Sequence, residues 1–258
     1  MASYPFRSAL VTGASSGIGE IMANVLADAG VATIVVARRD DRLRALAERS
    51  PHVEVLCADL TDPSGLAAVV DRIGDAARPV DLVVNNAGFG TNGLFRELDP
   101  DRLDREIELN VVALTRLSHA ALAAMVPRGQ GWLLNVSSIA GFQSAPRLAV
   151  YAATKAYVTS LTESLHEEVR SSGVHVTALC PGLTKTEFQS VSNTSSYADR
   201  FPDLVWTSPE QVARSGLDAV VANRTLAVPG LQYQVMSALT NVTPRWFRRR
   251  VSSLVQRA

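Results

Sequence analysis

The sequence is short of cysteine and of net charge, and each shortage argues against a class of protein. Its 258 residues include two cysteines, Cys57 and Cys180, each at the end of a strand-like apolar run. Two cysteines so placed do not suggest a disulfide framework, and we expect both to be small, buried apolar side chains. The 25 basic residues are balanced by 25 acidic ones, which argues against a general nucleic-acid binder.

Long apolar runs and clustered histidines are lacking too. No run of 18 apolar residues is present, and the first residues lack the apolar stretch of a secretion signal, which favours a cytoplasmic protein. The histidines His52, His119, His166 and His175 are scattered and lack the spacing of metal ligands. We therefore expect no metal site.

Strand-like and helix-like segments alternate along the chain, which predicts parallel βαβ units in a doubly wound α/β sheet with helices on both faces. Residues 183–206 have no strong period, and we expect a loop or a mobile pair of helices there. No internal linker or repeat is present, so residues 1–235 should form one domain, with 236–258 as a separate tail. Strands are expected over residues 7–11, 31–37, 53–56, 82–84, 131–136, 174–179 and 225–228. Helices are expected after the first turn to residue 29, then over 40–49, 62–76, 99–125, from 151 to about 172, and from 208.

The stretch from Asn135 to Lys155 combines residues suited to proton transfer. Tyr151 and Lys155 are four residues apart in a predicted helix, so they share one face, one turn apart. An ammonium beside a phenol favours the phenolate, and we expect the pKa of Tyr151 to fall from about 10 toward neutrality. A serine hydroxyl at the end of the preceding strand could polarise the same substrate oxygen, as carbonyl/alcohol chemistry requires. Tyr-x-x-x-Lys alone is also a common helical pair with no chemistry.

A glycine-rich turn joins the first predicted strand to the first helix. Gly13, Gly17 and Gly19 would let backbone N–H groups approach a pyrophosphate at the helix N-terminus. The spacing Gly-x-x-x-Gly-x-Gly differs from the usual dinucleotide fingerprint. A flexible turn is the alternative interpretation of the glycines alone, and the flanking predicted strand and helix argue against it.

Taken together, several motifs resemble the short-chain dehydrogenase/reductase family in order and spacing over about residues 5 to 230. They are Thr12 with its glycine turn, Asp59, Asn85–Gly88, Asn110, Ser138, Tyr151 with Lys155, and Pro181 with Gly182. The resemblance implies a Rossmann-type sheet of seven parallel strands and a nicotinamide cofactor. It also implies a homodimer or homotetramer formed through helices 101–125 and 151–172.

The resemblance further implies a catalytic tetrad of Asn110, Ser138, Tyr151 and Lys155. Tyr151 would give a proton to the substrate oxygen as hydride moves, and Ser138 would hydrogen-bond that oxygen. Lys155 would hold the nicotinamide ribose, and Asn110 would place a water that links Lys155 to solvent. Ser137 is the competing serine, but Ser138 lies at the family's usual separation from Tyr151. Without this role, Asn110 would be an exposed polar position of its helix.

The cofactor is expected to be NADP(H). The position that carries an acid in NAD-dependent members of the family falls on Ala37, and Arg38 and Arg39 follow it. A guanidinium grips a phosphate through paired N–H donors, so Arg38 should be the principal contact, with Ser15 or Arg39 assisting. Alternatively, both arginines are a solvated start to the helix over 40–49.

The resemblance extends the cofactor site to a larger set of residues. Asn86 has a second interpretation, as a structural residue that ties the fourth strand to its neighbour. The expected cofactor contacts are Gly13, Ser15, Ser16, Gly17, Ile18, Gly19, Arg38, Arg39, Asp59, Leu60, Asn86, Ala87, Gly88, Tyr151, Lys155, Pro181, Gly182, Thr184 and Thr186.

Aromatic residues near the expected site favour a lipophilic ketone or aldehyde as substrate. The expected substrate contacts are Phe89, Ser138, Phe142, Tyr151 and Phe188, with the segment 183–207 as a substrate loop. The same aromatic residues would serve equally well as lid and core packing.

The tail over 236–258 has a basic, amphipathic pattern. Thr243 is a plausible N-cap, Phe247 and Val251 begin an apolar face, and five arginines follow Met236 with no acid. Such a helix fits a peripheral contact with an anionic membrane, an acyl carrier protein, or a surface of its own or a partner subunit.

The sequence leaves three functional hypotheses. The leading one is an NADP(H)-dependent reductase or dehydrogenase acting on a carbonyl/alcohol pair. The second is a reductase of 3-oxoacyl thioesters on a carrier protein, and the third is a regulator that senses NADP(H) without turnover. An intact tetrad argues against the regulator, because a sensor has no need of Tyr151.

Overall fold

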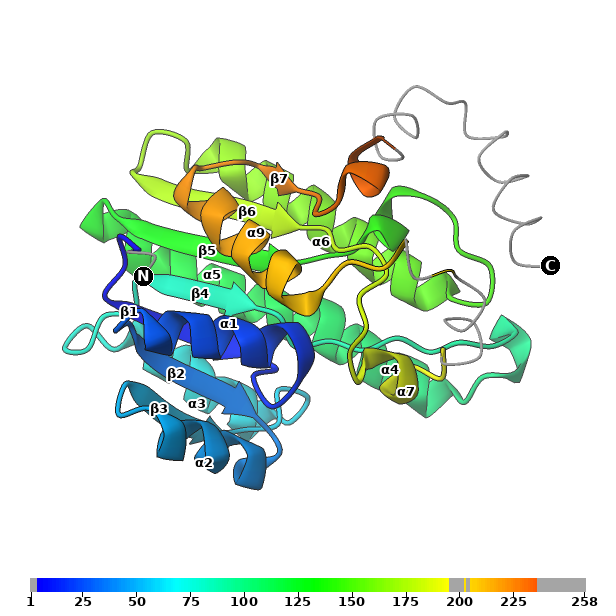
Figure 1. The fold of residues 1–258 in the computed structure, drawn as a ribbon, viewed down its shortest axis with the longest axis horizontal. Helices are drawn as coiled ribbons and strands as arrows, with labels where there is room; N and C mark the ends of the chain where they lie inside the picture. The colour runs from blue at the N-terminus through cyan, green and yellow to red at the C-terminus, as the bar shows by residue number, and fades with distance from the viewer. Residues whose placement is uncertain (1–3, 195–201, 203–204, 236–258) are drawn as a thin grey trace.

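A computed structural model describes residues 4–194, 202 and 205–235. Within these ranges, seven parallel strands form one sheet in the order β3-β2-β1-β4-β5-β6-β7 (Figure 1). The strands are β1 (Ser8–Thr12), β2 (Ala32–Ala37), β3 (Val53–Cys57), β4 (Leu82–Asn85), β5 (Gly131–Val136), β6 (Val174–Leu179) and β7 (Leu226–Ala227). The doubly wound fold class predicted from the sequence is confirmed, and the predicted strand ends agree to within one residue.

Helices cover both faces of the sheet because successive side chains of a buried strand point to opposite faces. In Figure 1, α1 and α9 lie in front of the sheet, with α5 and α6 behind it. One core joins α1, α2 and α9 to the sheet through residues such as Val11, and the other joins α3, α5 and α6 through residues such as Leu10. The α-helices are α1 (Gly17–Asp28), α2 (Asp40–Arg49), α3 (Pro63–Gly74), α4 (Pro100–Ile107), α5 (Leu114–Met125), α6 (Ala149–Glu168), α7 (Phe188–Val191) and α9 (Pro209–Val221).

The long helix expected over 99–125 is interrupted. A π-helical turn, η2 (Glu108–Ala113), separates α4 from α5 and contains Asn110. A π-turn adds one residue to a helical turn and often marks a functional site. Short 3-10 turns elsewhere are η1 (Phe95–Glu97), η3 (Val126–Arg128) and η4 (Ile139–Phe142). By length and composition alone, residues 100–128 would be able to cross a membrane, but the buried side of α5 packs into the core.

Polar side chains cap the starts of two helices. Asp62 caps α3, since its carboxylate accepts hydrogen bonds from the backbone N–H groups of Ser64 (3.1 Å) and Gly65 (2.9 Å). The Ser208 hydroxyl caps α9 in the same way, accepting from the N–H of Gln211 (3.1 Å).

The two cysteines differ in burial. Cys180, at the end of β6, is buried as expected, but Cys57 is exposed, so that prediction is wrong for Cys57. The reason is topological: Cys57 ends β3, and β3 is the edge strand of the sheet, where fewer elements cover the side chains.

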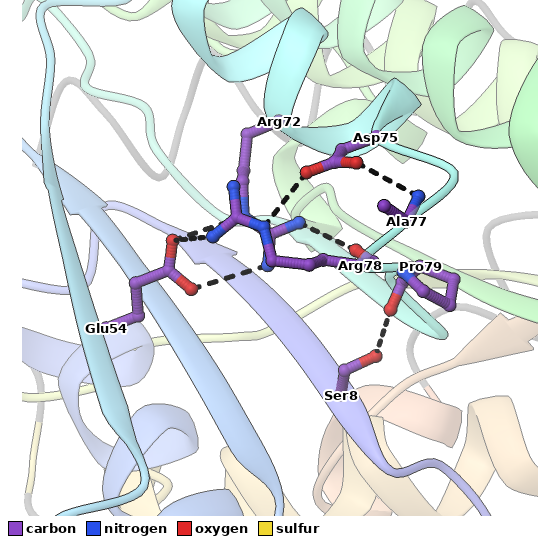
Figure 2. A network of polar contacts seen from close by, with 7 residues as sticks. All are labelled: Ser8, Glu54, Arg72, Asp75, Ala77, Arg78 and Pro79. Atoms are coloured by element: carbon purple, nitrogen blue, oxygen red, sulfur yellow. Dashed lines mark hydrogen bonds and ion pairs between the residues drawn. The ribbon is translucent and has the colours of Figure 1, made fainter.

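A cluster of charged side chains links β3, α3 and the loop before β4 at the amino ends of the strands (Figure 2). Glu54 near the start of β3 pairs with Arg72 of α3 (3.2 Å) and with Arg78 (3.5 Å), which also pairs with Asp75 (2.9 Å). Ser8, at the start of β1, donates a hydrogen bond to a backbone carbonyl of the loop before β4 (2.7 Å). This cluster lies at the amino ends of the strands, which leaves the carboxyl ends for ligands.

Candidate active site

A cavity of about 960 Å³ lies at the carboxyl ends of the strands. Most of the residues predicted to bind cofactor or substrate meet there. Those that line it are Gly13, Ser15, Ser16, Gly17, Ile18, Arg38, Arg39, Asp59, Leu60, Asn86, Ala87, Gly88, Phe89, Ser138, Tyr151, Lys155, Pro181, Gly182, Thr184, Thr186 and Phe188. Three predicted residues, Gly19, Asn110 and Phe142, are not among the described residues of the cavity wall.

The glycine-rich turn is tightly packed, which argues against the flexible-turn alternative. Gly13 and Gly17 have φ angles of +66° and +59°, a region that favours glycine. A Cβ on Gly19 would lie 2.5 Å from the Gly13 carbonyl oxygen, so no side chain fits. Asn86 fixes the turn by donating to the Thr12 carbonyl (2.9 Å), which gives it the structural role considered above. The turn offers bare backbone to a ligand, as a pyrophosphate site requires.

The two arginines after β2 differ in how they are held. Arg39 donates from Nε to the Ser15 hydroxyl (3.1 Å) and from Nη1 to the Glu187 carboxylate (2.8 Å). The Arg38 side chain is 71% exposed and lies 3.7 Å from the Asp59 carboxylate. Arg39 is therefore the guanidinium fixed beside the glycine turn, although the sequence favoured Arg38 as the principal contact.

Two adjacent serines follow β5, and their hydroxyls have different surroundings. The Ser137 hydroxyl donates to the Lys155 carbonyl (2.8 Å) and lies 2.7 Å from the Thr159 hydroxyl, inside the protein. The Ser138 hydroxyl donates to the Pro181 carbonyl (3.5 Å) and accepts from the Ala140 N–H (3.1 Å). Its interaction with Tyr151 lowers the pKa of that phenol in part. Ser138 is thus the serine whose hydroxyl meets Tyr151 at the cavity.

Burial dominates the electrostatics around Tyr151 and Lys155. The Lys155 ammonium donates to the Val136 carbonyl (2.8 Å) and lies 5.7 Å from the centroid of the Tyr151 ring. Burial raises the pKa of Tyr151 to about 12 and lowers the pKa of Lys155 to about 8. The expected lowering of the Tyr151 pKa is therefore wrong for this structure. The reason is that both groups are desolvated, and a buried ammonium is itself disfavoured.

Asn110 is fully buried, so the exposed-position alternative is excluded. Its side-chain amide donates to the Phe89 carbonyl (2.8 Å) and to the Thr154 hydroxyl (3.2 Å), and its oxygen accepts from the Phe89 N–H (3.2 Å). Asn110 thereby fixes the loop after β4 against α6. The predicted role in placing a water stays a prediction.

Glu106 is a buried acid that the sequence analysis missed. Its side chain is fully buried, and neither carboxylate oxygen has a hydrogen-bond partner in the described part of the chain. Burial raises the pKa of Glu106 to about 7, against the opposing effects of Thr91, Arg102 and Lys155. The available signal was spacing, since Glu106 is four residues before Asn110 and on the same helix face.

A strap formed by residues 184–191 runs over the cavity. Thr184 pairs with Thr207 in an isolated bridge, and Thr186 lies against the glycine turn, 3.1 Å from where a Cβ on Gly17 would be. The Phe188 ring is tilted against Tyr151, with centroids 5.4 Å apart. The strap therefore contacts both the glycine turn and Tyr151.

The chain matches the family model described as short chain dehydrogenase over residues 7–196. An uncharacterized oxidoreductase from Myxococcus xanthus is 36% identical over 197 residues, which cover 75% of this chain and 78% of that protein. A short-chain dehydrogenase from Sphingobium yanoikuyae, solved in complex with NADPH, is 33% identical with a TM-score of 0.83, covering 92% of this chain and 94% of that one. The bulky-bulky ketone specific alcohol dehydrogenase from Comamonas testosteroni is 29% identical with a TM-score of 0.77, covering 93% and 96%.

Proposed function

The chain belongs to the short-chain dehydrogenase family, and on that premise we propose that it is an NADP(H)-dependent oxidoreductase that interconverts a lipophilic carbonyl and its alcohol. The observation that carries the proposal is the meeting of Ser138, Tyr151 and Lys155 at the wall of one cavity. The glycine turn and Arg39 fit a phosphorylated dinucleotide at the other end of that cavity.

The mechanism assigns one proton to Tyr151. When bound, the nicotinamide supplies or accepts the hydride. Tyr151 gives its proton to the substrate carbonyl oxygen, and Ser138 donates a hydrogen bond to the same oxygen. Because burial raises the pKa of Tyr151 to about 12, the phenol keeps its proton at neutral pH, which suits the direction of reduction. Lys155, with a pKa lowered to about 8, is suited to return a proton to Tyr151 after each turnover.

The preference for NADP(H) is supported by charge at the end of β2. Ala37 provides no carboxylate to repel a 2′-phosphate, and Arg39 is held beside the glycine turn by Ser15. The NADPH in the Sphingobium yanoikuyae structure agrees with this assignment.

A lipophilic substrate is supported by the cavity wall near Tyr151. Phe89, Leu148, Leu183 and Phe188 supply apolar surface there. The Comamonas testosteroni enzyme, which is specific for bulky-bulky ketones, has the same fold over nearly the whole chain. A bulky ketone is therefore the substrate class to test first, with 3-oxoacyl thioesters as the alternative.

The test is a panel of bulky ketones, aldehydes and 3-oxoacyl thioesters, followed by the loss of NADPH absorbance. We expect turnover of at least one bulky ketone by the wild-type protein. Tyr151→Phe should lower the rate by about 10³-fold while NADPH still binds. Substantial turnover by Tyr151→Phe contradicts the mechanism. Binding of NADPH without turnover of any panel member would favour the regulator.

We also propose a cytoplasmic homodimer or homotetramer formed through the helical segments 101–125 and 151–172. Phe95 is 64% exposed, and with Ile107 and Tyr157 it borders a shallow apolar depression of about 390 Å³. Light scattering after gel filtration should give a dimeric or tetrameric mass, reduced in Phe95→Glu. A monomeric wild-type protein contradicts this proposal. The predicted membrane or acyl-carrier contact of the tail falls outside the described residues.

A further inference from the structure

Glu187, in the middle of the strap and just before α7, places a carboxylate against Arg39 and Arg42. One oxygen of Glu187 lies 2.8 Å from Arg39 Nη1, and the other lies 3.6 Å from Arg42 Nη2. Hydrogen bonding to Arg39 and the charges of Arg39 and Arg42 hold the pKa of Glu187 below its usual range. The residue therefore stays ionised at neutral pH and acts as a counter-ion from the far side of the cavity.

Glu187 accepts a hydrogen bond from Arg39, the same guanidinium that we propose binds the cofactor. Arg39 is oriented by Ser15 of the glycine turn, at the place where a 2′-phosphate would meet the end of β2. Carboxylates and phosphates use the same N–H donors of a guanidinium. Nε and Nη2 of Arg39 already donate to Ser15 and Nη1 donates to Glu187, so a 2′-phosphate that takes paired donors of Arg39 must displace Glu187, and the two negative charges repel each other.

We propose that Glu187 is a specificity-determining residue that competes with the 2′-phosphate for Arg39 and so weakens the preference for NADPH over NADH. The inference rests on the proposed NADP(H) dependence. Ala37 stands where NAD-dependent members of the family carry an acid at the end of β2. Glu187, 150 residues further along the chain, places a carboxylate near the same position from the strap.

The exposure of the pair sets the size of the effect. The side chains of Arg39 and Glu187 are 43% and 41% exposed, so water and salt screen their attraction. A phosphate can therefore displace the carboxylate. Competition of this kind changes the cofactor affinity severalfold and does not block binding.

Little else has to move when Glu187 is displaced. The backbone around it is held by the Gln189 side chain, which accepts from the Thr186 N–H (3.0 Å) and donates to the Thr184 carbonyl (2.8 Å). Rotation of the Glu187 side chain alone frees Arg39. The effect should therefore appear in cofactor affinity, with kcat at saturating cofactor nearly unchanged.

The test compares dissociation constants of NADPH and NADH, measured by fluorescence titration at low salt. Glu187→Gln should tighten NADPH binding about fivefold and leave NADH binding within about twofold. The matched control is Glu48→Gln, which makes the same charge change on the exposed side of α2. It should leave both dissociation constants unchanged.

Two results would overturn the inference. One is an unchanged or weaker affinity of Glu187→Gln for NADPH at an unchanged melting temperature. The other is an equal gain for NADPH and NADH, because only NADPH carries the competing phosphate. If instead the proposed NADP(H) preference is wrong, the wild-type protein itself binds NADH and not NADPH. That result is distinguishable from both of the results above.

Discussion

The two ends of the cavity differ in how far their ionisable groups contact water. At the arginine end, Arg39 and Glu187 are each about two-fifths exposed and form an open ion pair. At the other end, Tyr151 and Lys155 are buried, as is Glu106 outside the cavity wall, and burial is the largest cause of the pKa shift of each group. If the proposed function holds, charge selects the ligand at the exposed arginine end, here called the wet end. Desolvation sets the pKa values at the buried Tyr151 end, here called the dry end.

The largest expected effect is at the dry end. Ser138→Ala should lower kcat/KM by about 100-fold, because it removes a hydrogen-bond donor to the reacting oxygen. Ser137→Ala is the matched control, since its hydroxyl bonds only protein groups. It should cost about 1 kcal/mol of unfolding free energy and leave kcat within a few-fold. Comparable losses of kcat in both variants would mean that the two serines are not functionally distinct.

A buried acid offers the next test of the dry end. The pKa of Glu106 rises from 4.5 to about 7 on folding, so the folded protein holds the extra proton more tightly than the unfolded chain. The cost of burying this carboxylate is absent below about pH 4.5 and complete above about pH 7. Glu106→Gln should therefore raise the free energy of unfolding by up to about 3 kcal/mol at pH 8, and by much less at pH 5. Urea titrations at the two pH values measure the difference, and an equal difference at both pH values contradicts the prediction.

The same variant has a kinetic signature. Ionised Glu106 raises the pKa values of Tyr151 and Lys155, so its removal should lower both. The alkaline limb of the pH–rate profile should then move to lower pH. A profile that does not move would show that Glu106 matters for stability alone.

A smaller effect is expected at the wet end. Arg39→Ala should raise the dissociation constant of NADPH about tenfold at low salt, and Arg38→Ala only about threefold, because Arg38 is the more exposed of the two. Both effects should shrink in about 0.5 M salt, where exposed charges are screened. A larger loss in Arg38→Ala than in Arg39→Ala would restore Arg38 as the principal contact.

The smallest effect should come from charges outside the cavity. Glu54→Gln weakens the cluster of Figure 2, where Arg72 keeps its hydrogen bond to the Arg78 carbonyl (2.9 Å). We expect a loss of about 1 kcal/mol or less in unfolding free energy and no change in NADPH affinity. Changed NADPH binding would mean that the two ends of the sheet are coupled.

Much of the fold and the site was predictable because it depends on local pattern. Strand ends follow from apolar runs, and the α3 start follows from Asp62 and Pro63. Ser138, Tyr151 and Lys155 share one strand-loop-helix unit, so their spacing alone brings them together.

The rest depends on contacts between distant segments and on burial. Arg39 and Glu187 are 148 residues apart in the chain, so no local pattern pairs them. The direction of the Tyr151 pKa shift and the exposure of Cys57 depend on how much protein surrounds each side chain. Spacing places Lys155 near Tyr151, but it does not say that the ammonium is desolvated as well.

The π-turn of residues 108–113 has a consequence for the helix that contains it. A regular α-helix would need one residue fewer there, and deletion of Val112 would restore the usual hydrogen-bond ladder. The wider turn takes up the extra residue, so α4 and α5 keep their faces, while side chains inside the turn point in other directions than they would in a regular helix. Asn110 lies inside this turn, where its amide donates to the Phe89 carbonyl. A regular helix and the hydrogen bond from Asn110 to Phe89 therefore exclude each other, and the π-turn is the conformation that allows this hydrogen bond.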